Sequence, residues 1–335
     1  MLKIGLDVHE RNSALCVLDS DGQIRERIAV RGHPRRMLER LKRIQEPFEI
    51  CFEASCNYGW LYDQLRRQAD RVVVAHPGRL RLIFRSKRKN DRIDAERLAK
   101  LLYLGEVPEV HVPSIDVRAW RQLIVHRRRY VSNRVRCKNA IRALLRTYGI
   151  SSPSALWSKK GLAWLQAVDL PTRTAELQRE QLLDDLRHDS RRIERVQDRL
   201  DEIASSHPGV TLLLTIPGVG PRTAEAFVAY VDDPMRFRPK SIGMYLGLVP
   251  SQDASSDRNR LGRITKTGPS IVRGLLTEAA WQGIRNSPAI RAVFERIQGD
   301  NVQRKKRAIV ATAHYLSRVM LSMLRSGETW RADMA

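Results

Sequence analysis

The sequence predicts an α/β amino-terminal domain with a mixed β-sheet, followed by a helical arm and a mainly α-helical carboxy-terminal domain. Short β-rich runs alternate with amphipathic segments over the first 105 residues. Apolar side chains recur at heptad spacing over residues 174–203. From residue 208 onward, helical patterns are separated by glycine-containing turns. We therefore expect three domains. They are residues 1–148, residues 149–207, which comprise a linker and the helical arm, and residues 208–335.

Five β-rich runs are expected to form the sheet of the first domain. The first three are joined by short loops and predict an antiparallel meander, whereas the last two alternate with helices. The helices are expected to begin at Pro34, at Tyr58 and near Asp91. The order β-β-β-α-β-α-β-α is that of ribonuclease-H-like domains and implies a mixed sheet with helices on its faces. The runs span residues 3–8, 13–18, 23–30, 48–52 and 71–76.

Residues 117–146 predict one long basic helix, which we place in the first domain. This window contains ten Lys or Arg residues and no Asp or Glu. A solvated helix face would explain the charge, and so would a helix that lies along phosphate groups. We favour the phosphate interpretation, because ordinary solvated faces mix both signs of charge.

A second long helix is predicted over residues 174–203. Its apolar positions follow a heptad seam that is interrupted at Asp189. The seam fits a coiled-coil arm used for oligomerisation or domain spacing, and it fits equally a helix packed on its own domain. The seam residues are Leu182, Leu186, Ile193, Val196, Leu200 and Ile203.

The composition excludes several classes of protein. The chain has 335 residues, a formal net charge of +23 and 42% hydrophobic residues, so it is not a disordered basic tail. With 29% charged residues and no long apolar run, it is not expected to span a membrane. The positive excess predicts a polyanionic partner, since neutralised phosphates release condensed counterions.

The amino-terminus and the cysteines favour a cytoplasmic protein, and with a nucleic-acid partner we expect it to be nucleoid-associated. The first residues lack the apolar stretch and cleavage site of a signal peptide. No CxxC pair occurs, and Cys16 and Cys51 lie in apolar runs that predict core positions. We therefore expect a reducing compartment.

Four carboxylates are candidates for a metal site. Asp7 ends the first strand and Glu53 the fourth, so both can lie at one edge of the sheet. Asp91 and Asp94 are three residues apart and share one helix face. Clustered carboxylates are the ligands that divalent cations need for phosphoryl transfer. Alternatively, Asp91 is the N-cap of its helix and Asp94 complements the helix dipole. For His9, a neighbouring or surface position is favoured over a role as ligand.

A Pro-Gly-Val-Gly turn at residues 217–220 resembles a helix-hairpin-helix element. Glycines at such a turn let backbone N–H groups approach a phosphate. Glycine turns between helices are common, so this motif alone is only moderately specific.

Six short motifs together resemble the IS110 family of insertion-sequence transposases. In the first half they are residues 5–8 (Gly-Leu-Asp-Val), 53–55 and 89–99, which resemble that family's DEDD RuvC-like domain. In the second half, residues 216–221, 245–250 and 261–268 resemble its second transposase domain. The resemblance covers almost the whole chain, with both halves in the expected order.

The resemblance implies a DNA transposase or recombinase that acts through a covalent phosphoserine. Asp7, Glu53, Asp91 and Asp94 would bind Mg²⁺ or Mn²⁺. The family carries a Ser-Ser-Gly stretch whose second serine is the nucleophile, whereas residues 253–257 here read Asp-Ala-Ser-Ser-Asp. Counting from both flanks places Ser255 at the nucleophile position, with Ser256 as the fallback.

The resemblance further implies donor and target DNA as partners, a non-coding bridge RNA as guide, and a dimer or tetramer. The alternative is a metal-dependent RuvC-like nuclease or Holliday-junction resolvase that uses no serine. A non-catalytic nucleic-acid-binding protein is a further alternative, which the complete set of four acids disfavours. The basic residues expected to contact nucleic acid are Arg85, Lys87, Arg88, Lys89, Arg127, Arg128, Arg129, Arg134, Lys138 and Lys266.

Overall fold

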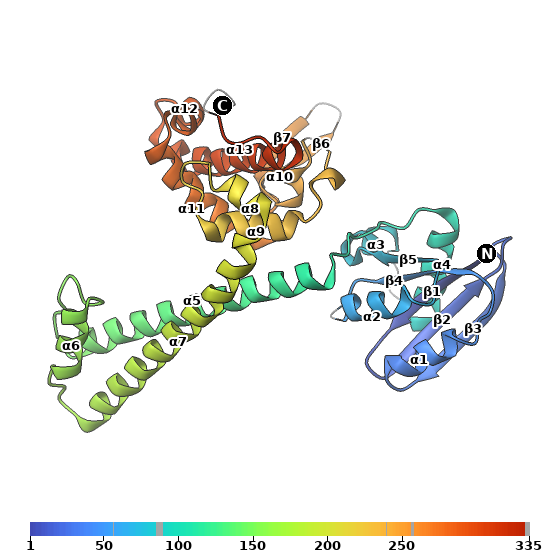
Figure 1. Ribbon diagram of the computed structural model, residues 1–335, viewed down its shortest axis with the longest axis horizontal. Coiled ribbons are helices and arrows are strands. Elements are labelled where there is room, and N and C mark those ends of the chain that lie inside the picture. The colour runs from blue at the N-terminus through green and yellow to red at the C-terminus, as the bar shows by residue number, and fades with distance from the viewer. Residues whose placement is uncertain (56, 85–89, 239, 256–257, 332–335) are drawn as a thin grey trace. The chain divides into compact units, whose positions relative to one another are not determined.

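A computed structural model describes residues 1–55, 57–84, 90–238, 240–255 and 258–331. The chain divides into two compact units, Met1–Ile115 and Asp116–Ala335 (Figure 1). Among the described helices, none has an apolar stretch suited to crossing a membrane.

A five-stranded mixed sheet organises the first unit, as the sequence predicted. Its strand order is β3-β2-β1-β4-β5. The β1–β2 and β2–β3 pairs are antiparallel, and the β1–β4 and β4–β5 pairs are parallel. This is the mixed arrangement expected for a ribonuclease-H-like domain. The strands are β1 (Leu2–Val8), β2 (Asn12–Leu18), β3 (Ile24–Arg31), β4 (Phe48–Glu53) and β5 (Arg71–Ala75).

Helices cover both faces of this sheet (Figure 1). Helices α1 (Pro34–Leu41) and α2 (Tyr58–Leu65) pack against the face formed by the even-numbered residues of β1 and β4. Helix α4 (Asp91–Leu104) covers the opposite face, where its apolar side chains meet those of β2, β4 and β5. Cys16 and Cys51 are fully buried on this second face, as predicted.

The contact between α4 and β1 depends on Gly5. A Cβ atom at this position would overlap the Ala95 carbonyl oxygen and the Ala99 amide nitrogen of α4. Only glycine therefore lets the helix backbone approach the strand so closely. The close approach sets the position of the first turn of α4 relative to the end of β1.

A short helix, α3 (Pro77–Ile83), follows β5 at a position where the sequence predicted none. The His76 imidazole accepts hydrogen bonds from the backbone N–H groups of Gly78 and Arg79, at 3.1 and 3.4 Å. Pro77 then occupies the first helical position, where its missing N–H costs nothing.

The second unit combines an arm of two long helices with a compact helical body (Figure 1). The arm consists of α5 (Ile115–Thr147), α6 (Lys159–Ala167) and α7 (Arg173–Ser205). Helix α6 lies within what we expected to be a linker. The body contains α8 (Pro208–Leu213), α9 (Pro221–Val231), η1 (Pro234–Arg236), α10 (Ile242–Tyr245), β6 (Pro250–Ser255), β7 (Arg258–Ile264), α11 (Ser270–Asn286), α12 (Pro288–Gln298), η2 (Val302–Arg304) and α13 (Lys305–Ser326).

The long basic helix α5 belongs to the second unit, whereas we expected it to belong to the first domain. Its buried residues Trp120 and Ile124 join the core of the helical body. Arg121 donates hydrogen bonds to the carbonyl oxygens of Ala229 and Tyr230, at 2.7 and 3.2 Å. Apolar burial and these polar contacts anchor the base of the helix in the body.

The heptad seam of α7 is used inside the unit. Leu186 packs with α5 and α6 near the far end of the arm, and Leu200 packs into the core of the body. Asp189 is buried as well, with 6% of its surface exposed. The described structure therefore satisfies the seam by intramolecular packing, and an oligomeric role for the arm stays a prediction.

A buried carboxylate, Glu225, lies where α9 meets α5 and α7. Only 1% of Glu225 is exposed, and its Oε1 atom lies 3.3 Å from Nη1 of Arg222, which also pairs with Asp201 of α7. Burial raises the pKa of Glu225 to about 7, although Arg222 and Arg127 oppose the rise. The charged form of this carboxylate is therefore costly within the junction.

Replacing Glu225 by Gln is expected to change how stability depends on pH. Between pH 4.5 and about 7 the unfolded chain loses this proton while the folded chain keeps it, so wild-type stability falls as pH rises. The variant has no such proton to lose. As pH rises across that range, its unfolding free energy should therefore increase relative to that of the wild type by up to about 3 kcal/mol. Urea unfolding at several pH values measures the difference, and parallel curves for the two proteins would contradict it.

The Pro-Gly-Val-Gly turn connects α8 and α9, as expected, but Gly218 has a packing role. Its φ is +91°, and a Cβ there would overlap the backbone of Gly283 in α11. Gly220 precedes α9 and faces open space. The first glycine therefore fixes the turn against α11, and phosphate binding by the turn stays a prediction.

Candidate active site

Asp7 and Glu53 come from neighbouring parallel strands. Leu6 of β1 lies opposite Phe52 of β4, so the next residue of each strand is one of the two acids. Because side chains alternate along a strand, both acids lie on the same face as Gly5 and Cys51, which is the face covered by α4. The sheet register thus brings together two acids that are 46 positions apart in the sequence.

Asp91 and Asp94 lie in the first turn of α4. The helix is capped by Asn90, whose side-chain oxygen accepts a hydrogen bond from the Arg92 N–H at 3.1 Å. The alternative that Asp91 is the N-cap is therefore wrong, and Asp91 is the first residue of the helix. Since α4 contacts β1 at Gly5, its first turn lies beside Asp7.

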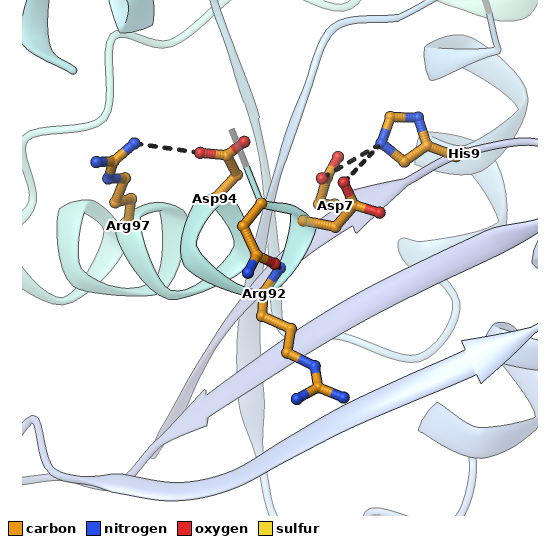
Figure 2. Close-up of polar contacts among 7 residues, drawn as sticks. Asp7, His9, Arg92, Asp94 and Arg97 are labelled. Atoms are coloured by element: carbon orange, nitrogen blue, oxygen red, sulfur yellow. Dashed lines mark hydrogen bonds and ion pairs between the residues drawn. The ribbon is translucent and has the colours of Figure 1, made fainter. Parts of the chain in front are cut away.

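His9 joins this group, whereas the sequence favoured a neighbouring or surface position for it over a ligand position. Its Nε2 atom lies 3.4 Å from Oδ2 of Asp7 and 3.6 Å from Oδ1 of Asp91 (Figure 2). One ligand atom from each of Asp7, His9 and Asp91 falls within 4.8 Å of the others, a spacing that could hold a metal ion. The signal in the sequence was the two-residue step from Asp7, which keeps both side chains on one face.

The electrostatics of Asp7 fit a bound cation. Burial raises the pKa of Asp7, His9 lowers it, and the carboxylates of Asp91, Asp94 and Glu53 raise it further. The other three predicted acids therefore all lie close enough to act on Asp7. A divalent cation is the group that relieves such repulsion, and carboxylate oxygens are its preferred ligands.

A cavity of about 470 Å³ opens beside these acids. Asp7, His9, Glu53 and Asp94 line it, together with the basic Arg81 and Arg97. Arg97 pairs with Asp94 at 3.3 Å (Figure 2), and its guanidinium carbon lies 5.0 Å from the centre of the Phe84 ring. The stacking and the ion pair hold a positive charge at the rim of the cavity, where a phosphate oxygen could accept from it. Arg97 was not among the residues predicted from the sequence, although it lies only one helical turn after Asp94.

Ser255 lies in the second unit, at the end of a β-hairpin that the sequence did not predict. It is the last residue of β6, and its backbone is opposite Arg258, the first residue of β7. The fallback residue Ser256 lies outside the described residues. The described side chains of residues 251–254 and 260–263 are all exposed. Because these side chains form no buried face, the sequence shows no hydrophobic alternation here that would predict the strands.

Two loops hold the base of this hairpin. The Lys266 N–H donates to the Gly247 carbonyl oxygen at 3.1 Å. Arg273 of α11 donates to the carbonyl oxygens of Leu246 and Thr267, at 2.8 and 2.6 Å. The motifs at residues 245–250 and 261–268 therefore form one structural element that supports the serine-bearing strands.

Comparison with known proteins finds a family model in each half of the chain. A transposase family model for DEDD transposases of the IS110 type matches residues 4–150, and the model described as Transposase IS116/IS110/IS902 family matches residues 210–295. A Sinorhizobium fredii protein named as a transposase, y4qE, is 30% identical over 288 residues, which cover 83% of this chain and 70% of the relative. The chain belongs to the IS110 family of insertion-sequence transposases.

Two further relatives of this transposase carry related names. The transposase for insertion sequence element IS1111A of Coxiella burnetii is 28% identical over 255 residues, 72% of this chain and 68% of the relative. A Pseudomonas aeruginosa protein named as a family 20 transposase is 29% identical over 236 residues, 67% of this chain and 68% of the relative. Both matches extend over most of this chain.

The basic residues predicted to contact nucleic acid differ in their surroundings in this transposase. Arg128 and Arg129 are exposed on α5, whereas Arg127 is half-buried and donates a hydrogen bond to Gln197 of α7 at 3.0 Å. Arg127 thus has a partner inside the fold. Arg134 and Lys138 are half-buried along the arm, and Lys266 is exposed with a φ of +55°. Arg85, Lys87, Arg88 and Lys89 lie outside the described residues.

Proposed function

We propose that this transposase cuts and rejoins DNA through a covalent bond between Ser255 and a DNA phosphate, with the acids Asp7, Glu53, Asp91 and Asp94 holding Mg²⁺ or Mn²⁺. The observation that carries the proposal is the convergence of His9, Glu53, Asp91 and Asp94 on Asp7, beside a cavity that three of the four acids line, in a chain of net charge +23. Such a concentration of negative charge in a basic protein is costly unless a cation occupies it.

The proposed chemistry divides the work between the two units. The Ser255 hydroxyl attacks phosphorus, an Oγ–P bond forms and one P–O bond of the DNA strand breaks. The hydroxyl proton passes to solvent or a nearby base, and the released strand end takes up a proton. A bound divalent cation would supply positive charge beside the scissile phosphate. Because the phosphoserine conserves the bond, a second strand end can displace the serine and restore a DNA phosphodiester.

The acids and the serine lie in different units, and the reaction requires both at one phosphate. The base of the serine hairpin is held by Arg273 and the 265–268 loop, while its strands are exposed. Two-stranded hairpins are marginally stable by themselves in water. These features support a hairpin that is seated on DNA or on another copy of the chain during the reaction.

We further propose that a structured non-coding RNA guides the transposase to donor and target DNA. The exposed residues Arg128 and Arg129, and the basic arm as a whole, support contacts with a nucleic-acid backbone. A protein of this kind reads backbone and shape, while base pairing reads the sequence. The dimer or tetramer that the family resemblance implies is part of this proposal.

The experiment that tests the function uses the full chain, Mg²⁺ and a DNA substrate with a nick beside the cleavage position, so that the cut strand diffuses away. The expected result is a protein–DNA adduct that survives denaturing electrophoresis and disappears after protease treatment. Efficient cleavage without an adduct would support the metal-dependent nuclease or junction resolvase instead. Omitting and adding the RNA transcribed beside the reading frame tests guidance in the same assay.

A further inference from the structure

A cavity of about 580 Å³ lies in the arm, at a position to which the proposed chemistry gives no role. Its walls come from α5, from the turn before α6, from α6 and from α7. The floor is apolar, with Leu183 and Leu186 of α7 both buried and Leu162 of α6 half-buried. The volume falls within the range of small-molecule binding sites.

The rim of this cavity is basic and contains no carboxylate. Arg134 and Lys138 of α5 line one side, and Arg187 and Arg191 of α7 line the other. Arg187 pairs with Asp184 at 3.1 Å. Within the described part of the chain, no ion pair is formed by the other three cations. Burial lowers the pKa of Lys138, and the positive charges of Arg134 and Arg142 lower it further.

Trp157 gives the cavity an aromatic wall. The Lys138 Nζ atom lies 4.8 Å from the centre of its ring, and the Arg142 guanidinium carbon lies 5.3 Å away. The half-buried ring thus combines an apolar surface with cations held next to it. Proteins that bind unpaired nucleic acid use this combination, since bases stack on aromatic rings and phosphates pair with the cations.

We infer that the arm cavity binds an unpaired nucleotide of a nucleic-acid strand, with the base against Trp157, Leu162 and Leu183 and the phosphate at Arg134 and Arg191. A free phosphate would leave the apolar floor and the tryptophan unused. A second copy of this chain, with its net charge of +23, would be repelled by a rim of like charge. The inference rests on the proposed nucleic-acid function only for the class of ligand, and it requires no strand cleavage.

The test compares variants of the full chain by fluorescence anisotropy with short oligo(U), oligo(dT) and blunt duplex DNA probes. Trp157→Leu keeps an apolar side chain but removes the ring, and is expected to weaken single-strand binding about tenfold while duplex binding stays unchanged. Trp157→Phe should restore most of the affinity. If Trp157→Leu weakens binding of oligo(U) alone, the site is assigned to RNA. If it weakens binding of oligo(dT) alone, the site is assigned to DNA. If it weakens both, the site accepts single strands of either kind.

A second experiment tests the basic rim of the cavity with the double variant Arg134→Gln and Arg191→Gln. Loss of two phosphate contacts should reduce the slope of log affinity against log salt by about 1.4 for single strands. Arg195→Gln is the matched control, because Arg195 is exposed on α7 and does not line the cavity. It should leave the single-strand preference intact. Thermal unfolding verifies that every variant is folded.

The inference is overturned if folded Trp157→Leu binds both single strands like the wild type, or if it changes only self-association in analytical ultracentrifugation. It is also overturned if the wild type binds neither single-stranded probe. Failure of the proposed catalytic function is recognised separately, as the absence of a covalent adduct from a protein that still shows the Trp157 effect.

Discussion

Replacing Ser255 by Ala is expected to abolish both the protein–DNA adduct and the rejoining of strands, with rates falling on the order of 10⁴-fold or more. Removal of the hydroxyl removes the atom that forms the bond to phosphorus, whereas the phosphate contacts remain. DNA binding should therefore stay within about threefold of the wild type, because it depends on the basic residues and not on the serine. Denaturing electrophoresis of labelled DNA measures adduct formation, and anisotropy measures binding.

Two other serines, Ser251 and Ser256, provide the comparison. Ser251→Ala alters an exposed position of β6 and should leave the adduct in place. Ser256→Ala tests the fallback nucleophile, and it should also retain the adduct if Ser255 attacks. Cleavage by Ser255→Ala at the wild-type rate would remove the recombinase proposal and leave a metal-dependent nuclease. Loss of the adduct in Ser256→Ala alone would move the nucleophile by one residue.

Replacing Asp7 by Asn is expected to lower strand cleavage by about 10³-fold or more while the protein remains folded. The carboxylate lies in the centre of the acid group, where burial, Asp91, Asp94 and Glu53 all raise its pKa. For an acid whose folded-state pKa is raised, the charged form costs stability above its unfolded pKa. The neutral amide removes that cost, so the metal-free variant should be at least as stable as the wild type at neutral pH.

Metal binding separates this prediction from a general loss of structure. Mn²⁺ should raise the unfolding temperature of the wild type, because it binds only the folded state, and should leave Asp7→Asn nearly unchanged. Glu10→Gln is the matched control, since Glu10 is an exposed carboxylate three residues away that does not line the cavity. A fully active Asp7→Asn variant, or one that Mn²⁺ stabilises like the wild type, would exclude Asp7 from the metal site.

The strands of the first unit were predictable because each carries a local signal. Apolar residues in β1 and β4 alternate or run together with clear ends, and Pro34 marks the start of α1. Helix α3 was missed because its signal is a side-chain cap from His76, which resembles the end of a strand in the sequence. The hairpin that carries Ser255 was missed because an exposed strand has no hydrophobic period.

In the two long helices, the sequence pattern predicted which residues are buried but not what they pack against. The heptad seam of α7 correctly indicated a buried stripe, and the structure fills it with α5, α6 and the helical body. The same seam could have joined two chains, because apolar burial has no direction and does not select a partner. The sequence of α5 likewise does not show which of its basic side chains have partners inside the protein. Arg121 and Arg127 have such partners, and Arg128 and Arg129 are exposed.

The sequence by itself determined the order of the five strands of the first unit and the excess of positive charge, since both are written in local pattern or composition, and it named the four candidate acids. Only the tertiary structure decided that His9 joins those acids and that an aromatic, basic cavity forms in the arm. Parallel pairing of β1 with β4 sets Asp7 beside Glu53, and the missing side chain of Gly5 lets α4 bring in Asp91 and Asp94. These contacts join residues far apart in the chain, and such contacts follow from strand register and helix packing, which no local pattern specifies.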